Sequence, residues 1–203
     1  MAGTTEWEAA VAQSTTWGTA VAVGASDGIA LESESMPEGI PEGIADDNIG
    51  DALSGGVYQG NVAVDGSITP GLRFKGTTQL LMALLMGESG DGASNGVPET
   101  AEAGVAFLHH MPFQPSNTGK HATLVIDKNV GTDQYYEYTT CKVHGVELSH
   151  NNGKAMAQFN LAAQQLERSS AINTSTEVDA ITHTTKRDLV LFNHVTLLLQ
   201  EVT

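Results

Sequence analysis

The chain has 203 residues, of which 40% are hydrophobic, and it carries a formal net charge of −15. This length fits a single domain with a real core, and the excess of acid argues against a basic groove for nucleic acid. No apolar run approaches the roughly 18 to 20 residues that cross a bilayer, and Glu6 and Glu8 stand where an export signal carries Lys or Arg. We therefore expect no membrane partner. The single cysteine, Cys141, excludes an internal disulfide and a cysteine-based zinc site, which fits a reducing cytoplasm.

The acid is concentrated at the start of the chain. Residues 1–72 contain 11 acidic residues and no Lys or Arg, whereas residues 73–203 contain 13 acidic and 9 basic residues. One interpretation is solubility, because excess charge keeps chains apart. The more specific interpretation is that these acids form a surface that must not bind the phosphates of a nucleic acid.

The start of the chain and three later stretches lack the period of a helix or a strand. Residues 1–28 are small, with Trp7 and Trp17 as the large anchors, and tryptophan is costly to leave in water. We therefore expect a docking arm here and a main domain over residues 29–203. Segments rich in Gly, Pro, acid, Ser or Thr predict long loops. These loops cover residues 34–56, 88–104 and 169–186.

Alternation of apolar and polar residues predicts a series of strands. Val62, Val64 and Ile68 alternate with polar residues, and Pro70 ends this run. Further strands are expected over residues 29–33, 105–110, 122–127, 134–140, 141–150, 154–165 and 189–202. With one helix, described below, this pattern indicates a mainly β fold. We expect an antiparallel β-sandwich or barrel with one flanking α-helix and long loops.

Two local features set the pairing of the strands near residue 150. Asn152-Gly153 is a strong signal for a tight hairpin turn. A phase slip in the apolar pattern beside Gly145 predicts a β-bulge. After the turn, one face of the strand is apolar and the other is polar but uncharged. The apolar face holds Ala155, Ala157, Phe159, Leu161 and Ala163, and the polar face holds Gln158, Asn160 and Gln164.

One helix is expected over residues 78–86, with Thr77 as its N-cap and Gly87 as its C-terminal stop. Its leucines share one side, and Met82 and Met86 fall on roughly the opposite side. The leucines can pack on the protein's own sheet. The Met side then needs another layer or another subunit, so Met82 and Met86 are candidate subunit-interface residues.

Residues that carry chemistry are few. His109, His110 and His121 could suggest a metal site, but adjacent strand residues point to opposite faces and no nearby acid completes the set. No G-x-S-x-G elbow is present, and Cys141, in a predicted strand, fits a small core residue. We expect no catalytic residue, no metal and no cofactor. A β-barrel enzyme or small-molecule binder remains an alternative.

Two stretches resemble the tail tube proteins of long-tailed bacteriophages. Residues 60–87, GNVAVDGSITPGLRFKGTTQLLMALLMG, resemble the family's strand, short linker and Leu-rich helix ending in Gly. Residues 141–167, CKVHGVELSHNNGKAMAQFNLAAQQLE, resemble its paired strands around a tight turn. The early Trp17-Gly18-Thr19 is also typical of the family's arm.

This resemblance implies a structural subunit rather than an enzyme. Subunits would join edge to edge into rings, hexameric in the family's manner, and the rings would stack into a tube through which viral DNA passes without specific binding. Expected partners are further copies of the chain and other tail proteins, such as the tape measure, terminator and distal tail proteins. The expected location is the virion tail, assembled in the host cytoplasm. A terminator or connector ring of the same fold is the alternative within this class.

A DNA conduit also predicts where particular side chains lie. Its inner wall must present few cations, because each Lys or Arg there would contact phosphate. Asp65, Glu147, Gln158 and Asn160 lie on polar strand faces and are the candidates for that wall. The acidic residues of the first loop are candidates for contacts between stacked rings, and they are Asp46, Asp47 and Asp51.

Overall fold

The computed structural model describes most of the chain. The described residues are 8–39, 44–45, 57–58, 64–73, 76–87, 98–102, 106–109, 113–116, 118–128, 134–183 and 189–191. The predicted inter-ring residues Asp46, Asp47 and Asp51 lie outside this set.

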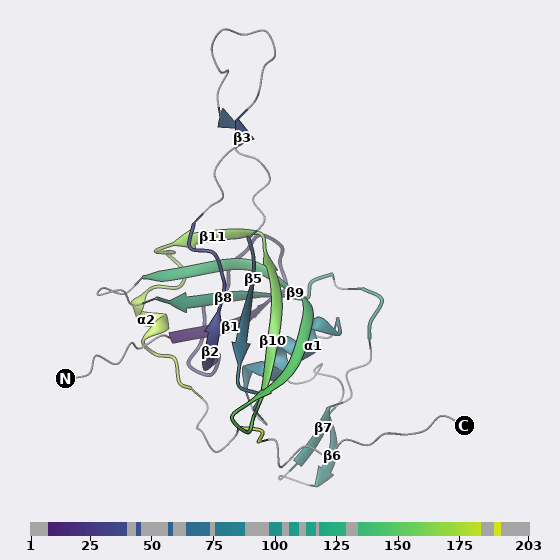
Figure 1. The fold of residues 1–203 in the computed structure, drawn as a ribbon. Coiled ribbons are helices and arrows are strands. Elements are labelled where there is room, and N and C mark those ends of the chain that lie inside the picture. Colours follow the sequence, from purple (N-terminus) through teal and green to yellow (C-terminus); the bar gives the residue numbers. More distant parts are fainter. Residues whose placement is uncertain are drawn as a thin grey trace, which may run out of the picture.

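The fold is built on one antiparallel sheet of seven strands (Figure 1). Six of them follow the order β1-β8-β9-β10-β5-β2, and β11 pairs with β9 off this path. Their bounds are β1 Glu8–Ser14, β2 Leu31–Glu34, β5 Val64–Pro70, β8 His121–Asp127, β9 Tyr135–Asn151, β10 Lys154–Ala163 and β11 Gln165–Arg168. The predicted mainly β, antiparallel fold is confirmed. The sheet is not closed into a barrel.

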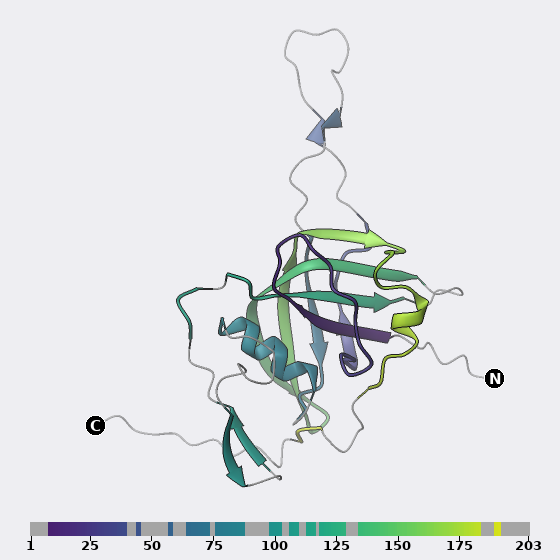
Figure 2. The ribbon, with the colours of Figure 1, turned by 180° about the vertical axis from the view of Figure 1, so that it is seen from behind.

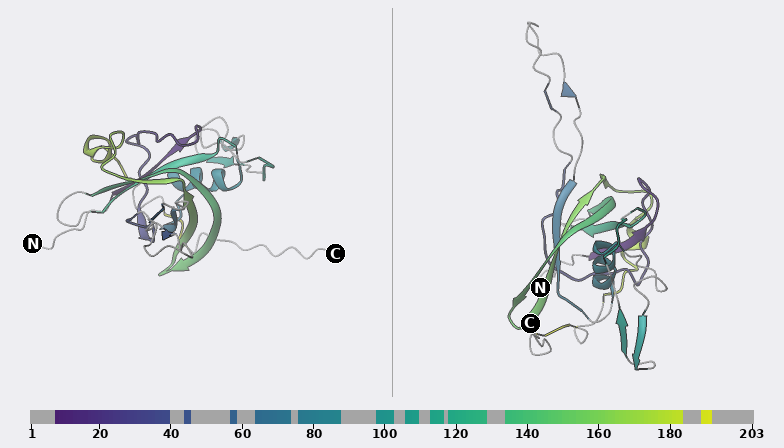
Figure 3. Two further views of the ribbon diagram at one scale, coloured as in Figure 1. Left: turned by 90° about the horizontal axis from the view of Figure 1, so that it is seen from above. Right: turned by 90° about the vertical axis from the view of Figure 1, so that its right-hand side faces the viewer.

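Strand β9 joins the two halves of this sheet. Its first part pairs with β8 and β11, and its second part pairs with β10. Between the two parts Thr140 has a φ of 55°, which is uncommon for a residue other than glycine and marks a sharp local bend. The curvature of β9 and β10 is plain when the molecule is seen from above (Figure 3, left). The sequence predicted two strands, 134–140 and 141–150, where the structure has one continuous strand.

The hairpin and the bulge are where the sequence predicted them. Asn152 and Gly153 have φ values of 49° and 77°, as the favoured two-residue hairpin turn requires. Asn160 pairs with Gly145 and Leu161 pairs with Val143, so His144 is the extra residue of a bulge.

The core lies between the curved sheet and α1, which spans Thr77–Leu85. Figure 2 shows this helix lying across the strands. Leu81 and Leu84 are buried, and Leu80, Leu85 and Met82 pack against the same core cluster while partly exposed. A second apolar cluster covers the other face of β1 and β8. It contains Ala10, Ala12, Val23, Val125, Val178 and Ile181.

The sequence predicted the C-terminal end of α1 correctly but not its N-cap. Gly87, with φ of 81°, ends the helix as predicted, and its N–H bonds to the Leu84 carbonyl at 3.2 Å. Thr77 is not the N-cap, because Gly76 takes that place without a side-chain cap. The Thr77 hydroxyl instead donates to the carbonyls of Asp27 and Gly28, each at 3.1 Å, and so ties the helix start to a neighbouring segment.

Several segments predicted as arm or loop contain regular structure. Within the predicted arm 1–28, strand β1 is part of the sheet and its Ala10 and Val11 are buried, because both faces of β1 meet apolar layers. The predicted loops contain β3 Ile44–Ala45, β6 Pro98–Glu102 and the helix α2 Ser175–Val178. Strand β3 pairs with β4 Val57–Tyr58, just after the first loop, and β6 pairs with β7 Ala106–His109, which matches the predicted strand 105–110.

The end of the chain supports the predicted last strand only in part. Of residues 189–202, the structure describes 189–191. Leu189 forms an isolated bridge with Arg73, and Leu191 forms one with Lys154. The rest of this prediction lies outside the described residues.

A buried ion-pair cluster closes one end of the sheet. The Lys128 ammonium lies 2.8 Å from Glu34 and 3.1 Å from Glu38, and it donates to the Met36 carbonyl at 3.2 Å. The side chains of Lys128 and Glu34 are only 4% and 7% exposed. Nearby, the Tyr138 hydroxyl donates to the Pro37 carbonyl at 2.9 Å, and burial raises the pKa of this hydroxyl. We call residues 34–38 with Lys128 the clamp.

The clamp generates a stability prediction. Lys128→Met leaves the Glu34 carboxylate buried without its partner, which costs about 3–5 kcal/mol in buried pairs of this kind. We expect urea unfolding to show a loss of this size and the double variant Lys128→Met/Glu34→Gln to recover much of it. Lys154→Met, which breaks the exposed pair with Glu32, is the control and should cost less than about 1 kcal/mol. Equal losses for the two lysine variants would contradict the role of the clamp.

Candidate assembly surfaces

The four residues predicted to line a conduit share one face of one sheet. In the ladders Glu147 stands opposite Gln158, Asn160 stands opposite Ser67, and Asp65 stands opposite Ala162. Directly opposed residues project to the same side of a sheet, and positions 158, 160 and 162 alternate with the buried Phe159 and Leu161. We call this the polar face. Its role as a lumen wall stays a prediction.

The polar face has a neutral centre and acids at its margin. Gln158 Nε2 donates to the Ser67 hydroxyl at 3.3 Å, and the hydroxyls of Ser67 and Ser35 are 2.9 Å apart. Asp65 and Glu147 are exposed. This arrangement presents uncharged hydrogen-bonding groups at the centre of the face.

Two lysines also belong to this face. Lys142 stands opposite Ala162, and Lys154 is in phase with Gln158 along β10. Lys154 is ion-paired with Glu32 at 2.7 Å, with both side chains partly exposed. Burial lowers the pKa of Lys142. The polar face is therefore mixed in charge rather than purely acidic.

Both outer edges of this half of the sheet lack a partner strand. Within the described residues, no strand pairs with the outer edge of β9 over residues 143–149 or with the outer edge of β2. Leu148, near the β9 edge, is 65% exposed although it stands opposite the buried Ala157. Its apolar side chain therefore lies on the same side of the sheet as the core residues, but beyond the area that the core covers. An exposed edge of this kind is a template for pairing with another chain.

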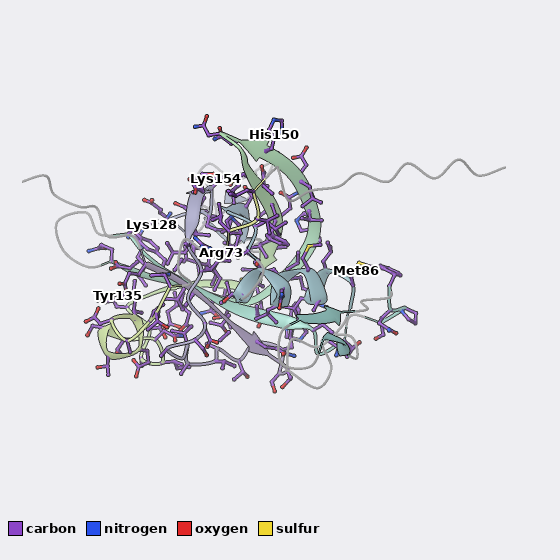
Figure 4. The ribbon with its side chains drawn as sticks, turned by 90° about the horizontal axis from the view of Figure 1, so that it is seen from below. Arg73, Met86, Lys128, Tyr135, His150 and Lys154 are labelled. Atoms are coloured by element: carbon purple, nitrogen blue, oxygen red, sulfur yellow. The ribbon has the colours of Figure 1, made fainter. Side chains whose placement is uncertain are left out.

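The two methionines that were predicted to contact a neighbouring subunit are already half-buried within their own chain. Met82 is half-buried and packs against the core cluster, and Met86 is the half-buried C-cap of α1. Figure 4 shows Met86 and Lys128 on opposite sides of the molecule, with His150 and Lys154 near the β9–β10 hairpin. Coverage of Met82 and Met86 by a neighbouring subunit stays a prediction.

The structure describes only part of the histidine set that was considered as metal ligands. His121 is buried and meets the Trp17 ring edge-on, with ring centroids 5.5 Å apart. His109 is at the end of β7, and His110 lies outside the described residues. Within the described residues, no group of three or more His, Cys, Asp or Glu could hold a metal ion. No helix among them is long and apolar enough to span a membrane.

The sequence did not predict two features of the structure. One is the clamp, which joins residues about 90 positions apart. The other is an open hollow beside Trp17 and His121. The exposed Trp17, at 58%, was predicted to anchor an arm, and an unpaired tryptophan was the one signal that pointed to this surface.

Comparisons with known proteins found no match in sequence and several solved structures of low similarity. No protein-family model and no curated protein matches the sequence. Among solved structures, the SPP1 tail tube is similar at a TM-score of 0.47 and 12% identity, over 90% of this chain and 86% of that chain. The anti-feeding prophage tube-terminating cap is similar at 0.42 and 11%, over 83% and 90% of the two chains. The sheath–tube complex of PVC, an extracellular contractile injection system, is similar at 0.39 and 12%, over 81% and 88%.

The buried thiol supplies a test of the packing around the bend in β9. Cys141 is 1% exposed, and burial raises its pKa to about 12, so the reactive thiolate is scarce at pH 8. We expect folded protein to react with a disulfide reagent at least about a hundredfold more slowly than protein in urea. In a Cys141→Ser background, the variant Ser149→Cys moves the thiol to an exposed position of the same strand and should react fast while folded. Rapid labelling of Cys141 in native protein would contradict this packing.

Proposed function

We propose that this chain is the structural subunit of a tail tube, which acts by edge-to-edge assembly into rings and not by catalysis. The observation that carries the proposal is the sheet formed by the second part of β9, β10, β5 and β2. Its two outer edges are both unpaired within the described residues. The sequence resemblance in residues 60–87 and 141–167 supports the same class of protein.

The strand directions suit a ring. Successive strands of this sheet are antiparallel, so β2 runs opposite to β9. If copies are related by rotation about an axis roughly along the strands, β2 of one copy meets β9 of the next in antiparallel fashion. Such a contact uses two different surfaces and forms a closed ring when the rotation closes. Ring closure would also remove the exposed edges.

The two faces of the sheet then take different roles. The apolar face, with Ala157, Phe159 and Leu161, is covered by the protein's own core. The polar face is left to line the ring. This wall has a neutral centre, acids at its margin and two lysines, of which Lys154 is paired with Glu32. It therefore offers few phosphate contacts, and adhesion of DNA depends on such contacts with Lys and Arg. We therefore propose passage of DNA without specific binding, hexameric rings, and contact with tape measure, terminator and distal tail proteins at the ends of the tube.

A terminator or connector ring is the second candidate. It would use the same edges but stop at one ring, so the two functions differ in whether rings of pure protein stack into long tubes. Electron microscopy of the concentrated protein separates them.

The central test changes one exposed residue of the β9 edge. Leu148→Lys places a charge where a neighbouring strand would pack, and charged residues on edges block strand pairing. Because Leu148 is 65% exposed, we expect normal circular dichroism and thermal unfolding but loss of rings in sedimentation and electron microscopy. Glu147→Lys, the adjacent residue on the polar face, is the matched control and should still assemble. Normal rings from Leu148→Lys would rule out this edge as the contact.

The polar face generates a prediction about DNA. Asp65→Lys and Glu147→Lys should permit tube assembly but slow DNA release from particles that carry them. Each added cation creates a phosphate contact that is repeated around every ring, and such contacts weaken as salt rises. The slowing should therefore be largest at low salt. Ejection rates equal to those of the unchanged protein at all salt concentrations would leave solubility as the role of these acids.

A further inference from the structure

An open hollow lies along β11, at one end of the sheet. It has a volume of about 440 Å³ and is lined by Gly39, Leu166, Glu167 and Arg168. A space of this size accommodates the tip of a protein loop. Within the described residues, β9 is the one strand that pairs with β11, so the other edge of β11 has no partner strand. We call this space the β11 hollow.

Two walls of the β11 hollow are fixed by the subunit itself. Leu166 is buried and belongs to the core cluster. Cζ of Arg168 lies 5.2 Å from the centre of the Tyr136 ring, and the guanidinium donates to the Glu38 carbonyl. A side chain held in this way loses little conformational entropy when it binds a partner. The hollow therefore offers a preorganised cation next to the exposed carboxylate of Glu167.

The turn between β9 and β10 projects from the opposite end of the sheet. It is formed by Asn152-Gly153 just before β10, whereas β11 begins just after β10 ends. Strand β10 has ten residues, so it spans about 30 Å along its length. Figure 1 shows β11 at the top of the molecule and the β9–β10 hairpin at the bottom, and the right-hand view of Figure 3 agrees.

The tip of this hairpin carries groups that suit the β11 hollow. Residues 149–153 are all exposed. The side-chain amides of Asn151 and Asn152 both donate and accept hydrogen bonds, so they match the donors of Arg168 and the acceptors of Glu167. Residues 148–166 contain one Lys, one His and neither Asp nor Glu. The hairpin therefore brings no carboxylate that Glu167 would repel.

We propose that the β11 hollow receives the β9–β10 turn of a second copy of this chain, as a contact between stacked rings. The proposed ring axis runs roughly along the strands of the polar face. Stacked rings then place the hairpin end of one copy against the β11 end of another. A contact between two different surfaces that does not close on itself repeats indefinitely, which produces a tube. The inference rests on the proposed function and names the two surfaces of its stacking contact.

The first experiment fills the hollow from Gly39. A Cβ atom added there would meet no atom of the described part of the chain within 4 Å, and the Gly39 backbone is outside the left-handed region. Gly39→Phe should therefore leave thermal unfolding and rings unchanged. It should raise the protein concentration needed for tubes, seen by sedimentation and electron microscopy, at least about tenfold, as loss of a central contact does.

Gly39→Ala is the matched control, because it leaves most of the hollow open, and it should form normal tubes. Normal tubes from Gly39→Phe would overturn the inference and leave the proposed function intact.

The second experiment joins the two surfaces covalently in the full chain. In a Cys141→Ser background, Asn151→Cys places a thiol on the hairpin and Glu167→Cys places one at the hollow. Under mild oxidation each variant alone should stay monomeric on a non-reducing gel. Their assembled mixture should give linked dimers, because a disulfide needs Cα atoms about 4.4–6.8 Å apart. A mixture of Asn151→Cys with Ile172→Cys, which is exposed outside both surfaces, is the control and should give none.

The outcomes separate this inference from the proposed function. Tubes without linked dimers would overturn the hairpin–hollow contact and leave the proposed function intact. Linked dimers without rings would overturn the proposed function while the contact stands. Absence of both dimers and rings would overturn both.

Discussion

The architecture depends on one strand that is shared by two halves of a sheet. Strand β9 gives its first part to β8 and β11 and its second part to β10, and it changes direction at Thr140, whose φ is positive. Because backbone N–H and C=O groups must be paired when buried, the bend is possible only where β10 gives way to β11 on one side and β8 ends on the other. The curved sheet produced in this way surrounds an apolar core that α1 closes.

The same bend leaves part of the sheet incomplete. Over residues 143–149 the outer edge of β9 has no further strand within the described residues, and β2 ends the sheet on the other side. One face of this extension is apolar and covered, while the other is polar. A sheet with two open edges and one wettable face is costly for an isolated chain, because it invites pairing. It is well suited to a subunit whose edges are paired by its neighbours.

Buried polar groups mark the two ends of β8. At one end Lys128 is held by carboxylates and a carbonyl, which offset the cost of placing an ammonium inside the protein. At the other end, Nδ1 of the buried His121 has no hydrogen-bond partner within the described part of the chain, and its ring meets that of Trp17 edge-on. The first group is satisfied within the chain and the second is not.

The sequence by itself determined the features that depend on neighbouring residues. Alternation determined that Ala157, Phe159, Leu161 and Ala163 of β10 are buried, although it did not foresee the buried Met156 or the half-buried Ala155. Asn152-Gly153 determined the hairpin, the phase slip beside Gly145 determined the bulge, and the run of leucines before Gly87 determined α1. It also placed Asp65, Glu147, Gln158 and Asn160 on polar strand faces, but only the ladders showed that these faces are one surface. Tertiary structure decided the continuity of β9, the place of β1 in the sheet, the clamp and the hollow beside Trp17 and His121. Each depends on contacts between residues far apart in the chain, such as Glu38 with Lys128 or Gly18 with Thr140, and local pattern carries no information about such partners.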